Sequence, residues 1–346
     1  MLYILSFLVA ILSAHWIHPR LVRIALDKSI VDNPNARKLQ RRPTPVLGGI
    51  AVFFGSVIGL GCASITCDCS ELFIVVVAMM IMLYTGTMDD ILDLSPALRF
   101  LIEIGTVLLL IFVGGYTLND FHGLWGLNQI PQGVAIPLTV FAAVGIINAI
   151  NLIDGIDGLA SGLTGSALLV LGSLFLINGM WIYALLSFAT LGVLVPFFYY
   201  NVFGQADHGR KIFMGDTGSL TLGYILVFLA IRYASYNPDV AHYSAGAIVI
   251  AFSTLIVPMF DVVRVMIVRA RSHRSLFKPD RNHIHHKFLD MGMSAHKAMI
   301  SIVVIASLFS SLNILLVSFV NINIVFAGDI VIWVILSIWF EKAGNK

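Results

Sequence analysis

Long apolar segments alternate with short polar loops along the whole chain. Eleven of these segments are long enough to cross a bilayer as helices, a crossing that takes roughly 20 residues. We predict spans at about 2–19, 47–66, 71–88, 98–115, 133–150, 161–178, 181–199, 218–236, 242–264, 297–317 and 322–340. Pro258 lies inside the ninth span, where it removes a backbone hydrogen bond and predicts a kink. The pattern predicts an all-α polytopic membrane protein with one transmembrane domain over residues 1–346.

Composition and charge agree with this prediction. Of the 346 residues 58% are hydrophobic and 12% charged, about half the charged share of a soluble domain. The net charge of +2 decides little, but the basic residues are segregated. If the N-terminus faces outside, 20 of the 21 Lys and Arg residues fall on the cytoplasmic side, and Arg232 is the exception. By the positive-inside rule, this bias predicts an outside N-terminus and cytoplasmic polar loops.

One polar stripe interrupts the apolar pattern between residues 148 and 159. If this segment is helical, a spacing of three puts four polar side chains on one face, namely Asn148, Asn151, Asp154 and Asp157. Such a stripe is costly in so hydrophobic a chain unless it faces ligand, metal or water. Gly155 and Gly158 would let backbone or ligand approach closely. We therefore expect this segment to belong to an active site.

Two adjacent acids, Asp89 and Asp90, end the third predicted span. Carboxylates at the end of a helix repel each other and the negative end of the helix dipole. A bound cation or a shared proton would relieve this repulsion. The alternative is a solvated helix end with Arg99 as its counter-charge.

A second acidic motif, Gly215-Asp216-Thr217-Gly218-Ser219, opens the eighth predicted span. A glycine-rich turn at a helix start offers free backbone N–H groups together with one carboxylate. This combination suits a phosphate and its Mg²⁺. The alternative is that Asp216 merely caps the helix.

The last large loop is basic and leads into a cluster of histidines. Its candidate binding residues are Arg281, His283, His285 and His286. Zinc would suit three histidines, but no cysteine accompanies them and the surrounding arginines favour an anion. A phosphate is therefore the preferred ligand, with an anionic lipid surface as the alternative.

All these groups lie at the predicted cytoplasmic ends of spans. Carboxylates bind divalent metal and basic side chains bind phosphates, so the combination indicates phosphoryl transfer. A rigid turn, Pro43-Thr44-Pro45 followed by Gly48-Gly49, lies on the same side and is not needed for topology. A secondary transporter is the main rival, but it would place its carboxylates near mid-membrane and show an internal repeat. A catalytically inactive scaffold is a third class.

Four stretches make the chain resemble the polyprenyl-phosphate N-acetylhexosamine-1-phosphate transferase family: residues 89–100, 148–159, 213–219 and 281–286. Within it, the chain is most similar to the undecaprenyl-phosphate N-acetylglucosamine-1-phosphate transferases. The branch that transfers phospho-N-acetylmuramoyl-pentapeptide usually has a Lys shortly after its Asp pair, where this chain has Asp93. That branch stays an alternative.

The resemblance implies transfer of N-acetylhexosamine 1-phosphate from a UDP-sugar to undecaprenyl phosphate, with release of UMP. This would be the first membrane step of a cell-surface polysaccharide, such as a cell-wall polymer or lipopolysaccharide, at the bacterial inner membrane. The expected partners are both substrates and membrane lipids, without nucleic acid. The sugar, the polymer and the oligomeric state, including a homodimer, stay open.

The resemblance also implies roles for individual residues. Asp89, Asp90 and Asp216 would be catalytic, with Asp216 and Asp89 binding Mg²⁺ or Mn²⁺. Asn151, Asp154 and Asp157 would line the nucleotide and sugar pocket, and Arg281, His283, His285 and His286 would bind phosphates or the sugar. Whether the acceptor attacks directly or through an aspartyl-phosphate intermediate stays open.

Overall fold

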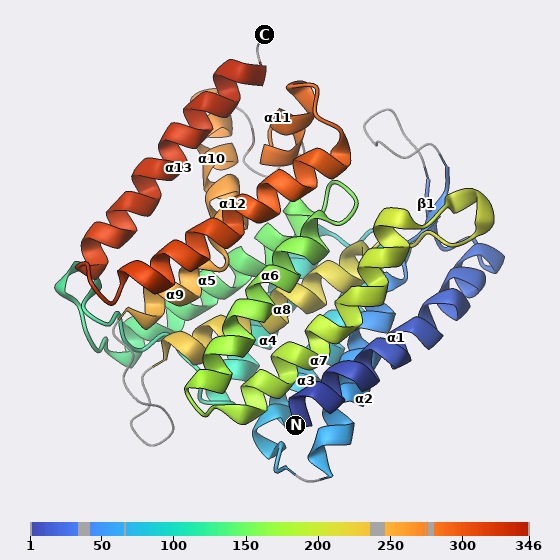
Figure 1. Cartoon of the computed structure of the whole chain (residues 1–346), viewed down its shortest axis with the longest axis horizontal. Helices are drawn as coiled ribbons and strands as arrows, with labels where there is room; N and C mark the ends of the chain where they lie inside the picture. The colour runs from blue at the N-terminus through green and yellow to red at the C-terminus, as the bar shows by residue number, and fades with distance from the viewer. Residues whose placement is uncertain are drawn as a thin grey trace.

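The computed structural model describes residues 2–33, 42–65, 67–235, 246–273, 275 and 280–344 (Figure 1). The described residues form thirteen α-helices: α1 Leu2–Asp27, α2 Gly48–Ser64, α3 Phe73–Leu92, α4 Pro96–Phe112, α5 Gln132–Ile153, α6 Leu159–Ile177, α7 Trp181–Phe198, α8 Gly215–Ala234, α9 Ala247–Ser253, α10 Ile256–Arg271, α11 Ile284–Asp290, α12 Ala295–Leu316 and α13 Ile322–Gly344. The smaller elements are the strands β1 Val31–Asp32 and β2 Thr44–Pro45, the π-helix η3 Tyr199–Phe203, and the 3₁₀ helices η1 Ser70–Leu72, η2 Leu124–Gly126 and η4 Ala206–His208. The predicted all-α fold is confirmed.

The chain is a multi-pass membrane protein, but the predicted count of about eleven spans is not confirmed. Eight of the described helices are long and apolar enough to cross a membrane, and nine if α9 and α10 form one bent span. The predicted segments 47–66 and 98–115 correspond to α2 and α4, which have only 17 residues each. In addition, α4 carries two charged residues, Arg99 and Glu103.

The kink predicted in the ninth segment is present. The axes of α9 and α10 differ by 73°, and the break lies between Ser253 and Ile256. Pro258 follows Thr254 by four residues, so its missing N–H is the one that would have bonded to the Thr254 carbonyl. The proline therefore explains why one continuous helix does not form here.

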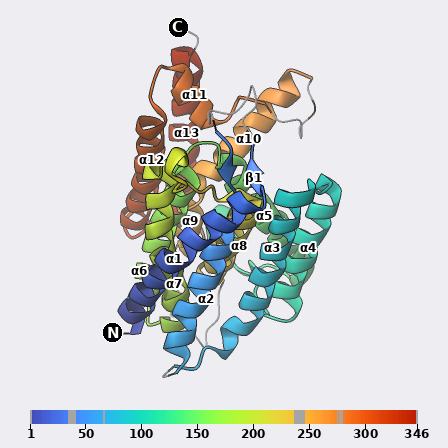
Figure 2. The ribbon, with the colours of Figure 1, turned by 90° about the vertical axis from the view of Figure 1, so that its right-hand side faces the viewer.

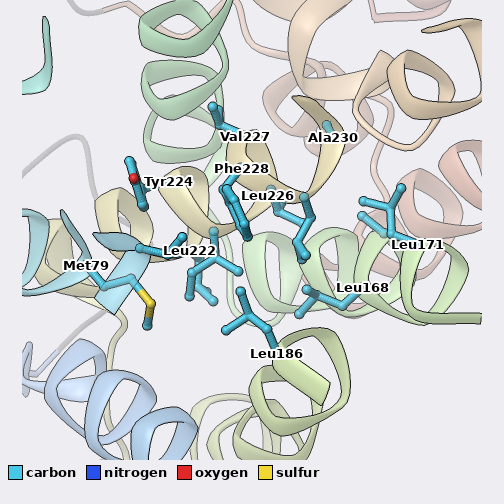
Figure 3. Packing of buried hydrophobic residues seen from close by; sticks show 14 of the residues in the cluster. Met79, Leu168, Leu171, Leu186, Leu222, Tyr224, Leu226, Val227, Phe228 and Ala230 are labelled. Carbon is cyan, nitrogen blue, oxygen red and sulfur yellow. The ribbon is translucent and has the colours of Figure 1, made fainter. Parts of the chain in front are cut away.

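Helix α8 occupies the centre of the bundle. It packs against α2, α3, α5, α6 and α9, and every residue from Thr217 to Ala234 is buried. Figure 3 shows its apolar side chains, among them Leu222 and Phe228, packed with Met79 of α3 and Leu186 of α7. By contrast, α12 and α13 lie at the edge in Figure 1, and most of the apolar surface of α13 is exposed.

The start of α8 touches its neighbours backbone to backbone. A Cβ atom on Gly49 of α2 would lie 2.2 Å from the Gly218 nitrogen, and one on Gly86 of α3 would lie 2.5 Å from the Asp216 carbonyl oxygen. Only glycine permits these approaches without displacing α8. The helix start is thus fixed between α2 and α3.

The rigid turn noted in the sequence supports the loop that precedes α8. The Phe213 N–H donates to the Pro45 carbonyl at 2.7 Å, and the Gly48 N–H donates to the Phe213 carbonyl at 3.1 Å. Both views of the ribbon place β1, α11 and the C-terminal end of α10 at one end of the bundle (Figures 1 and 2). The motif residues are located at this end, which we call the polar end.

Candidate active site

Asp89 lies in the last turn of α3 and is buried. Its Oδ1 accepts a hydrogen bond from the Leu94 N–H at 2.9 Å, and its Oδ2 accepts one from Arg99 Nη1 at 2.9 Å. The chain can return to Asp89 because Asp93 ends α3 in the left-handed conformation, with φ of 51°. Arg99 is therefore a counter-charge to Asp89, as one of the sequence alternatives expected.

Asp90 faces a different partner, the start of α8. Its carboxylate accepts hydrogen bonds from the Asp216 N–H at 2.8 Å, the Thr217 N–H at 2.9 Å and the Thr217 hydroxyl at 2.6 Å. The first N–H groups of a helix have no partner within the helix, and a carboxylate there also opposes the positive end of the dipole. Asp90 thus caps α8 from a neighbouring helix.

Asp216 projects from the first turn of α8 toward α5. Asn151 Nδ2 donates to Asp216 Oδ1 and, at 2.9 Å, to the Ser219 hydroxyl. The Asp216 carboxyl is also close enough to that of Asp89 for the two charges to interact. Two carboxylates from helices far apart in the sequence therefore meet at the polar end.

The fit to a metal ion follows from this pair. Among the described residues, no group of three or more His, Cys, Asp or Glu side chains is placed to hold a metal on protein ligands alone. Mg²⁺, however, commonly binds through one or two carboxylates, keeps several waters and takes further oxygens from substrate phosphates. Asp89 and Asp216 provide such a pair of oxygen ligands, so the residues fit Mg²⁺ bound together with a phosphate substrate.

A buried polar network behind Asp89 was not predicted. Glu103 of α4 is fully buried, and its Oε2 accepts a hydrogen bond from Asn148 Nδ2 at 2.5 Å. Arg99 lies between them, with its Nη2 3.4 Å from Asn148 Oδ1 and its Nε 3.6 Å from Glu103 Oε1. The i, i+4 spacing of Arg99 and Glu103 was the available sequence signal.

The polar stripe at residues 148–159 is not one helical face, which corrects the prediction. Helix α5 ends at Ile153, and Asp154 and Asp157 lie in the loop before α6. Gly158 has φ of +80°, a conformation that a helix cannot contain. Asn148 lies within α5 and contacts Glu103, whereas Asp154 and Asp157 lie beyond the end of the helix.

The two loop acids differ in their surroundings. Asp157 forms an ion pair with Lys211, at 2.5 Å. Asp154 is exposed. Desolvation by the surrounding protein, followed by the carboxylates of Asp157, Asp216 and Asp90, raises the pKa of Asp154 to about 7. Asp154 therefore lies close enough to the other acids for their charges to affect its pKa.

Asn201 is a second residue that the sequence analysis missed. It lies in the π-helix η3 and is buried. Its Oδ1 accepts a hydrogen bond from the Gly158 N–H at 2.6 Å, and its Nδ2 donates to the Ile212 carbonyl at 2.9 Å. One amide thus joins the loop of Asp154 and Asp157 to the segment leading to Asp216.

The histidines reach this loop through His285. A Cβ atom on Gly155 would lie 2.2 Å from His285 Nε2, so the ring packs directly on the Gly155 backbone. Burial, followed by the neighbouring His286, lowers the pKa of His285 to about 3, and burial also lowers the pKa of His286. His285 is therefore neutral at physiological pH.

The other two predicted residues of this motif take different positions. His283 immediately precedes α11 and is buried, with its ring parallel to that of His285 at 6.0 Å. The Arg281 side chain is exposed. Residues 274 and 276–279 of the same basic loop lie outside the described residues.

The polar end therefore combines an acidic pair, a water-exposed acid beside an ion pair, and a set of histidines. Acidic oxygens are suited to a divalent metal, and N–H groups of Arg and His are suited to phosphate oxygens. This set can neutralise and position two phosphate groups, the main requirement of phosphoryl transfer.

Comparison with known proteins agrees with this chemistry. The sequence profile of glycosyl transferase family 4 matches residues 72–234. The chain is 34% identical over 316 residues to a probable undecaprenyl-phosphate N-acetylglucosaminyl 1-phosphate transferase of Bacillus subtilis (strain 168), covering 91% of this chain and 85% of the relative. It is 28% identical over 296 residues to an undecaprenyl-phosphate alpha-N-acetylglucosaminyl 1-phosphate transferase of Escherichia coli (strain K12), with coverages of 85% and 78%.

A protein of Salmonella typhi with the same name as the E. coli relative is 29% identical over 295 residues, covering 84% of this chain and 78% of the relative. These similarities extend over most of each chain, well beyond the four motifs. They confirm the family that the motifs indicated. The chain belongs to the undecaprenyl-phosphate N-acetylglucosaminyl 1-phosphate transferases of glycosyl transferase family 4.

Proposed function

We propose that the protein transfers N-acetylglucosamine 1-phosphate from UDP-N-acetylglucosamine to undecaprenyl phosphate and releases UMP. The observation that carries this proposal is the proximity of Asp89 and Asp216 at the polar end, where His285 packs on the loop of Asp154, in a chain whose relatives carry that name. We propose further that the polar end faces the cytoplasm of a bacterium, with the protein in the inner membrane and its N-terminus outside. The distribution of Lys and Arg supports this orientation.

The chemistry explains why acids and bases are both needed. The acceptor is a phosphate monoester with a second pKa near 6, so at pH 7 it is mostly a dianion. It needs little deprotonation, and its difficulty is repulsion from the diphosphate that it attacks. Mg²⁺ or Mn²⁺ bound by Asp216 and Asp89 would supply charge neutralisation there. The remaining tasks of the protein are orientation and hydrogen bonding.

Asp90 has a supporting role in this proposal. Its carboxylate accepts three hydrogen bonds from the start of α8, whereas that of Asp89 accepts two from other elements, so the task of Asp90 is to fix the position of Asp216. Asn151 orients the Asp216 carboxylate from the opposite side. The sequence analysis expected Asp89, Asp90 and Asp216 all to be catalytic. In this proposal only Asp89 and Asp216 act directly.

We propose that the remaining residues bind the donor. Asp154 and the Asp157–Lys211 ion pair would line the site for the nucleotide and sugar. His285, His286 and Arg281 would donate hydrogen bonds to phosphate or sugar oxygens, and His283, whose Nδ1 faces Asp261, would accept one from a hydroxyl or N–H group of the substrate. A neutral His285 donates from one ring nitrogen only, so it would contribute orientation more than charge.

We also propose direct attack by the acceptor phosphate. Asp89 is the candidate nucleophile beside Asp216, but each of its oxygens already accepts a hydrogen bond. Such bonds stabilise the carboxylate and lower its reactivity. An aspartyl-phosphate intermediate would require Asp89 to lose these contacts.

The test is release of UMP by the purified full-length protein in detergent, with Mg²⁺, UDP-N-acetylglucosamine and undecaprenyl phosphate. Parallel reactions with UDP-N-acetylgalactosamine and UDP-N-acetylmuramoyl-pentapeptide establish the sugar. UMP release that requires the lipid and favours UDP-N-acetylglucosamine supports the proposal. Absence of UMP with every donor, from a monodisperse preparation, would overturn it and favour a transporter or scaffold.

Isotope exchange separates the two mechanisms. Exchange of labelled UMP into UDP-N-acetylglucosamine that requires the lipid-linked product supports direct attack. Exchange without any polyprenyl lipid would indicate a covalent phospho-sugar enzyme. Light scattering of the same preparation tests the homodimer that was left open.

A further inference from the structure

The segment that carries the histidines, residues 280–286, is attached to α10 by two ionic contacts, of which the first is buried and the second partly buried. We call it the His segment. In the first contact, Asp261 of α10 is fully buried, and its Oδ2 lies 2.8 Å from His283 Nδ1. Its Oδ1 accepts the Ile284 N–H at 3.0 Å. Arg264, one turn further along α10, donates to Asp261 Oδ1 at 2.7 Å and to the Asn282 carbonyl at 2.5 Å.

The second contact joins Arg269 of α10 to Asp280. Arg269 Nε and Nη2 donate to the two oxygens of Asp280 at 2.9 and 3.0 Å. Asp280 also accepts the Asn282 N–H at 3.1 Å and Asn282 Nδ2 at 2.8 Å. This contact fixes the fold of the segment through Asp280 and Asn282.

The first contact involves a histidine ring directly, because Asp261 faces Nδ1 of His283. An ionised carboxylate can only accept hydrogen bonds, so the proton of His283 on this side must be on Nδ1. Fixing the proton on Nδ1 also fixes the plane of the ring and leaves Nε2 as the nitrogen that can meet a ligand. The ring of His283 lies parallel to that of His285, and His285 in turn packs on Gly155. The orientation of His283 is therefore linked to the acidic loop.

We propose that Asp261 is a positioning residue for the transfer reaction: it sets the tautomer and orientation of His283 so that the unprotonated Nε2 accepts a hydrogen bond from a hydroxyl or N–H group of the sugar nucleotide. Arg264 compensates the charge of Asp261, which allows the carboxylate to remain ionised in a buried place. The inference rests on the proposed binding of substrate by His283. It adds Asp261 of α10, the second half of a bent helix pair, to the residues that support substrate binding.

A double-mutant cycle tests whether Asp261 acts through His283. Asp261→Asn keeps the shape of the side chain but no longer selects the proton position. His283→Asn removes Nε2, while its amide N–H can replace Nδ1–H as the donor to Asp261. We expect Asp261→Asn to lower kcat/KM for UDP-N-acetylglucosamine roughly 10- to 100-fold, the range for removing a carboxylate that orients a functional histidine.

The expected signature is non-additivity. In the His283→Asn background, Asp261→Asn should lower kcat/KM by less than about twofold, since nothing remains for it to orient. Both single variants should also change the same parameter, either kcat or KM. Asp280→Asn is the matched control, and it should reduce kcat/KM by the same factor with and without His283.

The outcomes separate this inference from the proposed function. If Asp261→Asn has the same effect in both backgrounds, Asp261 is only structural and the inference is overturned. If His283→Asn has native kinetics while UMP is still released, the proposed role of His283 fails and the inference with it, but the transfer activity stands. If Asp261→Asn does not give a monodisperse protein, the paired change Asp261→Asn with Arg264→Gln removes both charges and replaces it in the cycle.

Discussion

The carboxylate of Asp90 accepts hydrogen bonds from both the N–H and the hydroxyl of Thr217, at 2.9 and 2.6 Å. Its neighbour Asp89 points toward Arg99 instead, because consecutive residues of a helix are turned by about 100°. Two adjacent acids that look equivalent in the sequence thus contact different helices. We infer that one maintains the position of α8 while the other takes part in the chemistry.

This division predicts different losses for the two acids. Asp90→Asn should lower the free energy of unfolding by about 1–2 kcal/mol, the range for a lost helix cap, and should reduce turnover because Asp216 moves. Asp89→Asn should reduce turnover with a smaller loss of stability, because its amide oxygen can still accept a hydrogen bond from Arg99 and no helix start depends on it. Thermal unfolding in detergent and UMP release measure the two effects. Equal unfolding midpoints for the two variants would contradict the assignment.

Asp216→Asn tests the metal. The change keeps the shape of the side chain but removes the charge proposed to bind Mg²⁺, so UMP release should fall by at least about 100-fold. Native activity should vanish in EDTA and return with Mg²⁺ or Mn²⁺. Asp207, an exposed acid paired with Arg42, provides the matched control, and Asp207→Asn should retain native turnover. Robust turnover of the native protein in EDTA would exclude this role for Asp216.

Gly155→Ala tests the contact between the acidic loop and the histidines. The added methyl group would lie 2.2 Å from His285 Nε2, so the ring must leave its position. We expect a loss of kcat/KM for UDP-N-acetylglucosamine of at least about tenfold, equivalent to 1.4 kcal/mol, in a protein that remains folded. Gly145→Ala in α5 is the control, since no atom lies within 4 Å of its added methyl group. Native kinetics in Gly155→Ala would show that the packing of His285 is irrelevant to activity.

The buried neutral His285 predicts a dependence of stability on pH. Burial, followed by His286, lowers its pKa from 6.5 to about 3 in the folded protein. Below pH 6.5 the unfolded chain therefore binds a proton that the folded protein does not, so stability is complete above this pH and falls with acidification. The loss should reach about 2 kcal/mol at pH 5. Unfolding midpoints at pH 7 and pH 5 measure it, and His285→Gln should show a smaller difference between them than the native protein.

Arg99 and Glu103 predict a rescue experiment. The Arg99 side chain is 19% exposed, whereas that of Glu103 is fully buried. Arg99→Met would remove the cation beside the buried Glu103 carboxyl group and should lower the unfolding midpoint. Adding Glu103→Gln should restore the unfolding midpoint, although the loss of the Asp89 contact should keep activity low. A double variant no more stable than Arg99→Met would show that Glu103 does not depend on Arg99.

Much of the architecture could be predicted because lipid imposes simple rules on sequence. Apolar length predicted the positions of the helices, and Pro258 predicted the bend near α10. The end of α5 was missed because helical spacing of Asn148, Asn151, Asp154 and Asp157 continues past Ile153, and only the glycines of the loop argued against it. Spacing shows which side chains could share a face, but not where the helix ends.

The residues that support the site were harder to predict. Asn201 and Asp261 each lie within or beside an apolar helix, and each has a partner more than ten positions away in the chain. A polar side chain in an apolar helix is costly unless it has a partner. The sequence therefore indicates that Asn201 and Asp261 have partners, but it does not show which residues these are. Only the folded arrangement shows that Asn201 binds Gly158 and Ile212, and that Asp261 binds His283.

The enclosure of α8 has a mechanical consequence. Lipid chains of different length change the tilt of the helices that they touch, and α13 is exposed to such changes over most of its surface. No residue of α8 between Thr217 and Ala234 is open to lipid, so bilayer thickness acts on it only through the surrounding helices. Asp216, at the first turn of this shielded helix, should keep its depth and orientation when the acyl-chain composition changes. The transfer site is thereby insulated from the membrane that supplies one of its substrates.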